Sequence, residues 1–98
     1  METFNLTNNE QKFINAQLKN NGCGAETAES LLVDNYSCQS MKDYREILPN
    51  LSDTQIGGYL SSLENKNVLY RDEDEWRGNT LWWVSDSYLE SLEPTAKF

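Results

Sequence analysis

The sequence predicts a mainly α-helical domain that carries a small β-hairpin in its second half. Three observations lead to this fold class. Apolar residues recur at helical spacing over much of residues 7 to 65. Serine or threonine followed three residues later by glutamate or glutamine marks several expected helix starts. Two short runs rich in aliphatic and aromatic residues, at 68–71 and 80–85, are typical of paired strands.

The helix expected at 52–65 has the strongest local signals. Ser52 and Gln55 form a capping box, in which each side chain satisfies a free backbone N–H at the helix start. The apolar side chains that follow at spacings of three and four residues are Ile56, Tyr59, Leu60 and Leu63. This spacing predicts one buried stripe and an opposite polar face.

Three further helices are expected at 7–20, 26–34 and 41–48. Thr7 and Glu10 form a capping box for the first, and Ser40 caps the third. Pro49 ends the third helix, because a residue that precedes proline disfavours the helical conformation. The predicted core consists of Ile14, Leu18, Leu31, Leu48, Ile56, Leu60 and Leu63.

The hairpin is predicted to have strands at 68–71 and 80–85 and a polar loop at 72–79. Neighbouring side chains of a strand point to opposite faces, so Trp82 and Trp83 are expected on different sides. One of them is expected to pack on the helices. A short last helix is predicted at 86–92, with Ser87 and Glu90 as its capping box.

Composition limits the class of protein and its chemistry. The 98 residues suit one domain over 1–98, and a hydrophobic content of 38% argues against a disordered chain. The apolar runs are too short for a membrane span or a signal peptide, so we expect a cytoplasmic protein. The chain has no histidine and only two cysteines, Cys23 and Cys38. We therefore expect no enzymatic activity, metal or cofactor. We also expect a monomer or weak dimer.

The join between the third and fourth expected helices is only Pro49-Asn50-Leu51, which is typical of a helix-turn-helix. The motif continues as Leu51-Ser52-x-x-Gln55-Ile56-Gly57-Gly58-x-Leu60-x-x-Leu63-Glu64-x-Lys66 and then Asn67-Val68-Leu69-Tyr70-Arg71. Over about residues 40 to 92 the chain resembles the winged helix-turn-helix superfamily, and the MarR-like small regulators most. The resemblance implies a helix-turn-helix at 40–66, a wing at 67–85 and DNA binding in transcription regulation. Asn67 departs from the glycine that is usual at that position.

The resemblance also implies that the helix at 52–65 enters the major groove of DNA. Its expected outward residues are Thr54, Gln55, Gly58, Ser61, Ser62 and Asn65. Gln and Asn side chains can read adenine, and Ser and Thr can contact bases or phosphates. The cations expected to contact phosphates are Lys42, Arg45, Lys66, Arg71 and Arg77. The alternative is that this polar helix face is only a solvated surface.

A net charge of −8 opposes contact with phosphates and favours basic partners. The tip of the hairpin is predicted to carry a run of acids and an aromatic residue, namely Asp72, Glu73, Asp74, Glu75 and Trp76. This tip is expected either to contact a basic protein or to be a solvated loop. Three functions stay open: a regulator that binds double-stranded DNA, which ranks slightly first, an acidic winged-helix module for protein contact, and a DNA-mimicking inhibitor. The small, acidic, Asn-rich chain would suit a phage or mobile-element gene.

Overall fold

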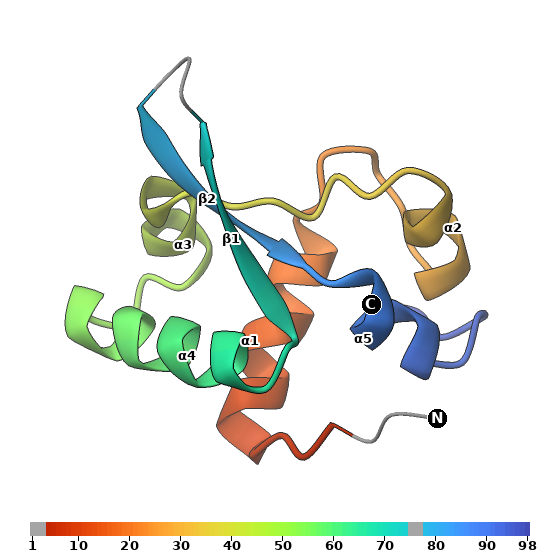
Figure 1. Ribbon diagram of the computed structural model, residues 1–98, viewed down its shortest axis with the longest axis horizontal. Coiled ribbons are helices and arrows are strands. Elements are labelled where there is room, and N and C mark those ends of the chain that lie inside the picture. The colour runs from red at the N-terminus through yellow and green to blue at the C-terminus, as the bar shows by residue number, and fades with distance from the viewer. Residues whose placement is uncertain (1–3, 75–77) are drawn as a thin grey trace.

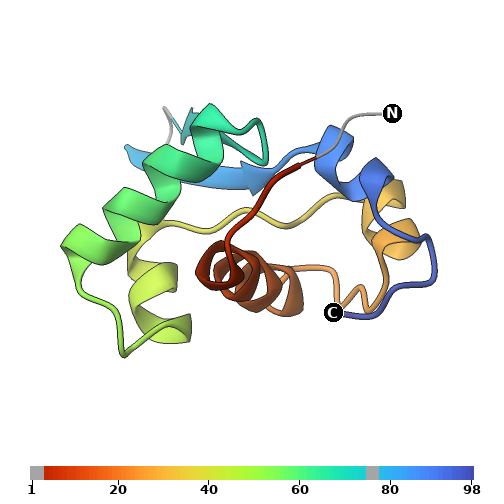
Figure 2. The ribbon, with the colours of Figure 1, turned by 90° about the horizontal axis from the view of Figure 1, so that it is seen from below.

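Five helices and a two-stranded antiparallel sheet form the part of the chain that the computed structural model describes, residues 4–74 and 78–98 (Figure 1). The elements are α1 (Asn8–Lys19), α2 (Ala28–Val33), α3 (Met41–Ile47), α4 (Asp53–Asn65), β1 (Leu69–Asp74), β2 (Asn79–Val84) and α5 (Asp86–Ser91). The helix α1 lies centrally, with α3 and α4 on one side and α2 and α5 on the other (Figure 2). The predicted helix-rich fold with a hairpin is confirmed.

Side-chain caps define where the helices begin. The predicted capping boxes of α1, from Thr7 and Glu10, and of α4, from Ser52 and Gln55, are both present. Ser40 caps α3, as expected. Each of these caps depends on residues three apart in sequence, which explains why the sequence predicts them well.

The starts of α2 and α5 differ from the prediction. Thr27 caps α2, so this helix begins later than position 26. The predicted capping box between Ser87 and Glu90 is wrong, because Ser85 is the N-cap of α5. The hydroxyl of Ser85 accepts a hydrogen bond from the backbone N–H of Tyr88 at 3.2 Å. The helix therefore begins as soon as β2 ends, with Ser87 already in its first turn.

One hydrophobic cluster connects α1, α2, α3, α4, the hairpin and α5. Among the predicted core residues, those that are buried are Ile14, Leu18, Leu31, Ile56, Leu60 and Leu63. The prediction is wrong for Leu48, which is only partly buried. Leu48 is the C-cap of α3 and borders an open groove between α1 and the turn that precedes α4.

The hairpin is longer than the sequence predicts. β1 and β2 pair in register from Leu69 opposite Val84 to Asp74 opposite Asn79. The prediction of a polar loop over 72–79 is therefore wrong at its start, since the acidic residues up to Asp74 belong to β1. Backbone pairing with β2 overrides the low strand propensity of aspartate and glutamate.

A third segment joins the sheet at a single residue pair. The backbone N–H of Gln39 donates to the carbonyl of Trp82 at 3.0 Å, and the N–H of Trp82 donates to the carbonyl of Gln39 at 2.9 Å. The segment before α3 thus lies beside β2, on the edge away from β1. Because side chains alternate along strands, the register aligns Gln39, Trp82 and Arg71 on one face of the sheet. The adjacent pair, Trp83 and Tyr70, lies on the other face.

A buried amide holds this three-part sheet against the helices. The side chain of Gln17, on α1, donates from Nε2 to the carbonyl of Ser37 at 2.9 Å and to that of Trp82 at 3.0 Å. Its Oε1 accepts from the hydroxyl of Tyr44, on α3, at 2.8 Å. Gln17 is fully buried, so these bonds satisfy the polar atoms of a side chain that water cannot reach.

The two adjacent tryptophans lie on opposite faces, as predicted. The Nε1 of Trp82 donates to Glu64 at 2.7 Å, and the ring lies edge-on to Tyr44 with centroids 6.1 Å apart. Trp83 instead stacks on Tyr70, with centroids 6.4 Å apart and planes 7° from parallel. Its Nε1 is buried without a hydrogen-bond acceptor in the described part of the chain. The indole N–H of Trp82 therefore stabilises the fold, whereas burial of the Trp83 N–H costs free energy.

We expect Trp82→Phe to lower the free energy of unfolding more than Trp83→Phe. The first substitution removes a hydrogen bond to a carboxylate, worth about 1.5–3 kcal/mol, and the second removes a donor that has no acceptor. Urea denaturation of both variants provides the comparison, and each variant controls for the loss of ring volume in the other. A loss from Trp83→Phe that equals or exceeds that from Trp82→Phe would contradict these roles.

Candidate functional site

The outward stripe of α4 is small, polar and uncharged. Thr54, Gly58, Ser61 and Asn65 are all exposed. A Cβ atom placed on Gly58 would meet no atom within 4 Å, so the space beside this part of the helix is open. The four predicted DNA-contacting residues thus share one accessible stripe.

Two other predicted contact residues of α4 have structural partners. The Oε1 of Gln55 accepts from the backbone N–H of Ser52 at 2.8 Å, as part of the capping box. The hydroxyl of Ser62 donates to Glu10, on α1, at 2.7 Å. Gln55 thus stabilises the start of α4, and Ser62 stabilises the contact of α4 with α1. Both residues lie beside the exposed stripe.

Arg45 is paired with a carboxylate across the turn between α3 and α4. Its Nε and Nη2 donate to the two carboxylate oxygens of Asp53 at 3.0 and 2.9 Å. Hydrogen bonding to Arg45 lowers the pKa of Asp53, so the carboxylate is ionised wherever the pair forms. Both side chains are more than half exposed, which makes this pair weak in stability but effective in neutralising the cation.

Lys66 is paired with a buried carboxylate. Its Nζ lies 2.6 Å from Oε1 of Glu10, whose side chain is only 4% exposed. Burial by itself would raise the pKa of Glu10, but hydrogen bonds from Lys66, Ser62 and Thr7 outweigh it and lower the pKa to about 2. Glu10 is therefore ionised at neutral pH and ties α1 to the C-terminal end of α4.

Arg71 lies over a carboxylate as well. Its Nε is 3.7 Å from Glu64, which also accepts the hydrogen bond from Trp82. Lys42 is exposed on α3 and makes no salt bridge within residues 4–74 and 78–98. Arg77 lies outside the described residues. Among the predicted phosphate contacts, Arg45, Lys66 and Arg71 are thus each held by a carboxylate of the protein itself.

The predicted acidic tip is only partly described. Asp72 and Glu73 are exposed in β1, and Asp74 ends that strand. Glu75 and Trp76 lie outside the described residues. Asp72 shares a sheet face with Tyr70, two residues earlier, whereas Glu73 points to the opposite face. Tyr70 is itself exposed on β1, and its place opposite Trp83 depends on the strand register.

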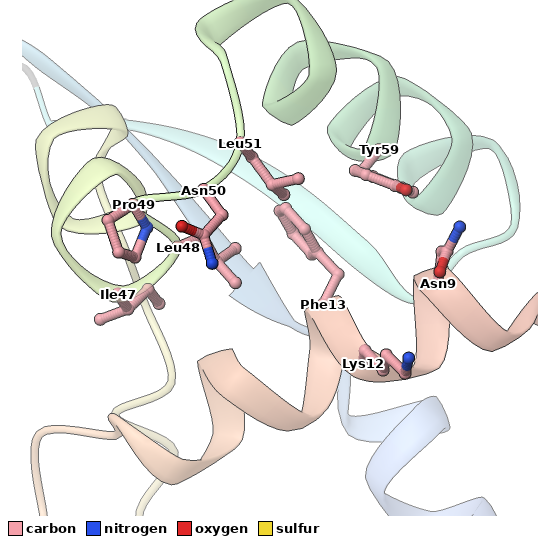
Figure 3. Close-up of a pocket in the computed structure, with 9 residues that line it drawn as sticks. All are labelled: Asn9, Lys12, Phe13, Ile47, Leu48, Pro49, Asn50, Leu51 and Tyr59. Carbon is pink, nitrogen blue, oxygen red and sulfur yellow. The ribbon is translucent and has the colours of Figure 1, made fainter.

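An apolar groove of about 250 Å³ runs between α1 and the turn from α3 to α4 (Figure 3). Phe13 and Leu51 point toward one another in its middle, and Lys12 lies on the α1 side. The remaining lining residues are Asn9, Ile47, Leu48, Pro49, Asn50 and Tyr59. The groove explains the partial exposure of Leu48.

In the described part of the chain, no cluster of three or more His, Cys, Asp or Glu side chains is arranged to hold a metal ion. Likewise, none of the described helices is both long and apolar enough to cross a membrane. Cys23 and Cys38 are free thiols, one exposed and one partly buried.

No protein-family model, curated protein or solved structure matches the chain. Its own geometry and charges are therefore the basis for assigning a function.

We expect Glu10→Gln to destabilise the protein at neutral pH and to flatten its acid sensitivity. The pKa of Glu10 in the fold, about 2, lies below its ordinary value of 4.5. The ionised group therefore contributes stability above the ordinary pKa, and this contribution is lost as the pH falls toward 2. The expected loss of unfolding free energy at pH 7 is on the order of 2–3 kcal/mol.

Urea denaturation at pH values of about 7, 5 and 3 measures this effect. Glu90→Gln, at an exposed position on α5, is the matched control and should change little. If Glu10→Gln kept the wild-type decline in stability between about pH 5 and 3, the ion pair would not be the cause of that decline.

Proposed function

We propose that the protein is a non-enzymatic winged-helix module that binds a basic protein partner. The order of the elements supports the winged-helix assignment, since α3, a short turn and α4 lead directly into the hairpin. The pairing of Gln39 with Trp82 adds a third segment to the edge of β2, beside the helix-turn-helix. A fold does not define a function by itself, so the charges around α4 and the hairpin decide between partners.

The observation that carries the proposal is the internal pairing of the cations. Arg45, Lys66 and Arg71 lie where a DNA-binding helix-turn-helix would need phosphate contacts, and each faces a carboxylate. Phosphate contacts supply a large share of the affinity of such domains for DNA. To bind DNA, this protein would have to exchange its own ion pairs for phosphates against a net charge of −8.

A basic protein partner meets the opposite electrostatic conditions. It would be attracted by the net charge, and it would not require the internal ion pairs to open. Asp72 and Glu73 are exposed in β1 and available for such contact. The acidic hairpin and the neutralised helix-turn-helix therefore favour the same class of partner.

The non-enzymatic part of the proposal is supported by the residues that catalysis would need. The chain has no histidine, which removes the commonest general base. The carboxyl group with the strongly lowered pKa, Glu10, is held ionised by Lys66 and takes part in packing α1 on α4. This arrangement suits a structural ion pair better than a proton donor.

Direct titration distinguishes the two kinds of partner. We expect the wild-type protein to bind a peptide of alternating basic and small residues at about 50 mM salt, and to show no binding of a mixed-sequence duplex at micromolar protein. The double variant Asp53→Asn with Glu64→Gln frees Arg45 and Arg71. Its affinity for the duplex should rise about tenfold, and its salt dependence should steepen by about two counterions.

The control is Glu29→Gln with Glu90→Gln, which removes the same charge at exposed sites on α2 and α5. It should raise duplex affinity far less than the paired variant. Tight duplex binding by the wild-type protein, or an equal gain in both double variants, would count against the proposal.

DNA binding through α4 is a second candidate, favoured by the exposed stripe of small polar residues. Thr54, Ser61 and Asn65 could approach base edges closely because Gly58 leaves the middle of the stripe open. Lys42 could contact phosphate without breaking an ion pair in the described part of the chain.

For this second candidate we expect Asn65→Ala and Ser61→Ala each to reduce discrimination between duplex sequences by about 1–3 kcal/mol, because each removes a hydrogen bond to a base edge. Lys42→Ala should instead weaken all duplexes alike and reduce the salt dependence by about one counterion. Competition binding with a selected and a scrambled duplex measures both effects. Failure to bind any duplex at low salt would remove this candidate.

A further inference from the structure

The sheet presents one face that is turned away from the helix-turn-helix core. Trp82 lies on the inner face, where its ring meets Tyr44 of α3. The strand register places Trp83 and Tyr70 opposite one another on the other face. Asp72 follows Tyr70 on the same face. We call these three residues, Trp83, Tyr70 and Asp72, the aromatic face.

The aromatic face offers two stacked rings, one of which is open to solvent. The rings of Trp83 and Tyr70 stack nearly parallel, with centroids 6.4 Å apart. Tyr70 is 48% exposed, one of the few large hydrophobic side chains exposed to that extent in residues 4–74 and 78–98. Cross-strand stacking holds the ring in place, so a ligand that binds its open side loses little side-chain entropy of the protein.

The aromatic face also lies in a negative electrostatic environment. Burial, and after it the carboxylates of Asp86 and Asp72, raises the pKa of Tyr70, so the phenol is neutral at physiological pH. Arg71 belongs to the opposite face, near Glu64, and does not neutralise these acids. An aromatic ring with carboxylates nearby attracts cations both through its π-face and through charge.

We propose that the aromatic face binds an arginine side chain of the basic protein partner, with the guanidinium stacked on Tyr70 and paired with Asp72. This inference rests on the proposed function and names the surface and the chemical group that it recognises. A guanidinium is planar, stacks on aromatic faces and can donate two parallel hydrogen bonds to a carboxylate. Lysine offers only a compact charge, so the face should distinguish the two cations.

The test uses two peptides of equal length and charge, one of alternating Arg and Gly and one of alternating Lys and Gly. Each is titrated into the 98-residue protein, and binding is followed by calorimetry. We expect the arginine peptide to bind about two- to fivefold more tightly than the lysine peptide. Tyr70→Ala should abolish this preference, whereas Tyr70→Phe keeps the ring and should retain it.

Two substitutions at neighbouring positions test whether the Asp72 carboxylate contacts the arginine. Asp72→Asn and Glu73→Gln remove the same charge from adjacent residues of β1 that point to opposite faces. Asp72→Asn should weaken binding of the arginine peptide several-fold more than Glu73→Gln. Circular dichroism of each variant establishes that the fold is intact.

The possible outcomes distinguish failure of the aromatic-face proposal from failure of the proposed function. If the arginine peptide binds but Tyr70→Ala keeps the preference, or if Asp72→Asn and Glu73→Gln act equally, the aromatic face is not the site and the proposed function stands. If neither peptide binds, both the surface and the function are overturned. An arginine preference that disappears in Tyr70→Ala and persists in Tyr70→Phe supports both.

Discussion

The fully buried side chain of Gln17 joins parts of the chain that have no local reason to meet. Its amide bonds to the carbonyls of Ser37 and Trp82 and to the hydroxyl of Tyr44, so α1, the segment before α3, β2 and α3 share one polar centre. With that segment held, Gln39 can pair with Trp82, and α3 begins immediately afterwards. The position of α3 and α4 relative to the hairpin follows from this arrangement, and so does the assignment of side chains to the two sheet faces.

The distribution of charge follows from how the fold uses its few cations. Lys66 is held by the buried Glu10, where the hydrogen bonds overcome the cost of burial. Arg45 is held by an exposed carboxylate, and such a pair adds little stability while cancelling a surface charge. A phosphate would have to displace a buried carboxylate at Lys66 but only an exposed one at Arg45. Each pair neutralises one cation and one carboxylate, so the net charge of −8 is carried by the carboxylates outside these pairs.

The parts of the structure that sequence reasoning predicted are local. The capping box of Ser52 and Gln55 and the apolar stripe of α4 involve residues within one or two helical turns, so their spacing suffices to locate them. The errors arise where contact with a residue distant in sequence determines the extent of an element or the exposure of a side chain. β1 continues through the acidic residues because β2 lies opposite, and Leu48 is partly exposed because α1 leaves a groove beside it. The exposed stripe of α4 was predicted, but the engagement of Ser62 by Glu10 was not.

The sequence by itself determined the helices, the opposite orientation of Trp82 and Trp83, and the acidic character of the chain, because periodicity, caps and charge are properties of neighbouring residues. Only the tertiary structure decided which carboxylate holds Arg71 and that Tyr70 stacks on Trp83. Those pairings join residues on different elements, and their distances depend on strand register and helix packing. Since binding depends on which charges and rings stay accessible, the choice of partner is a property of the folded surface.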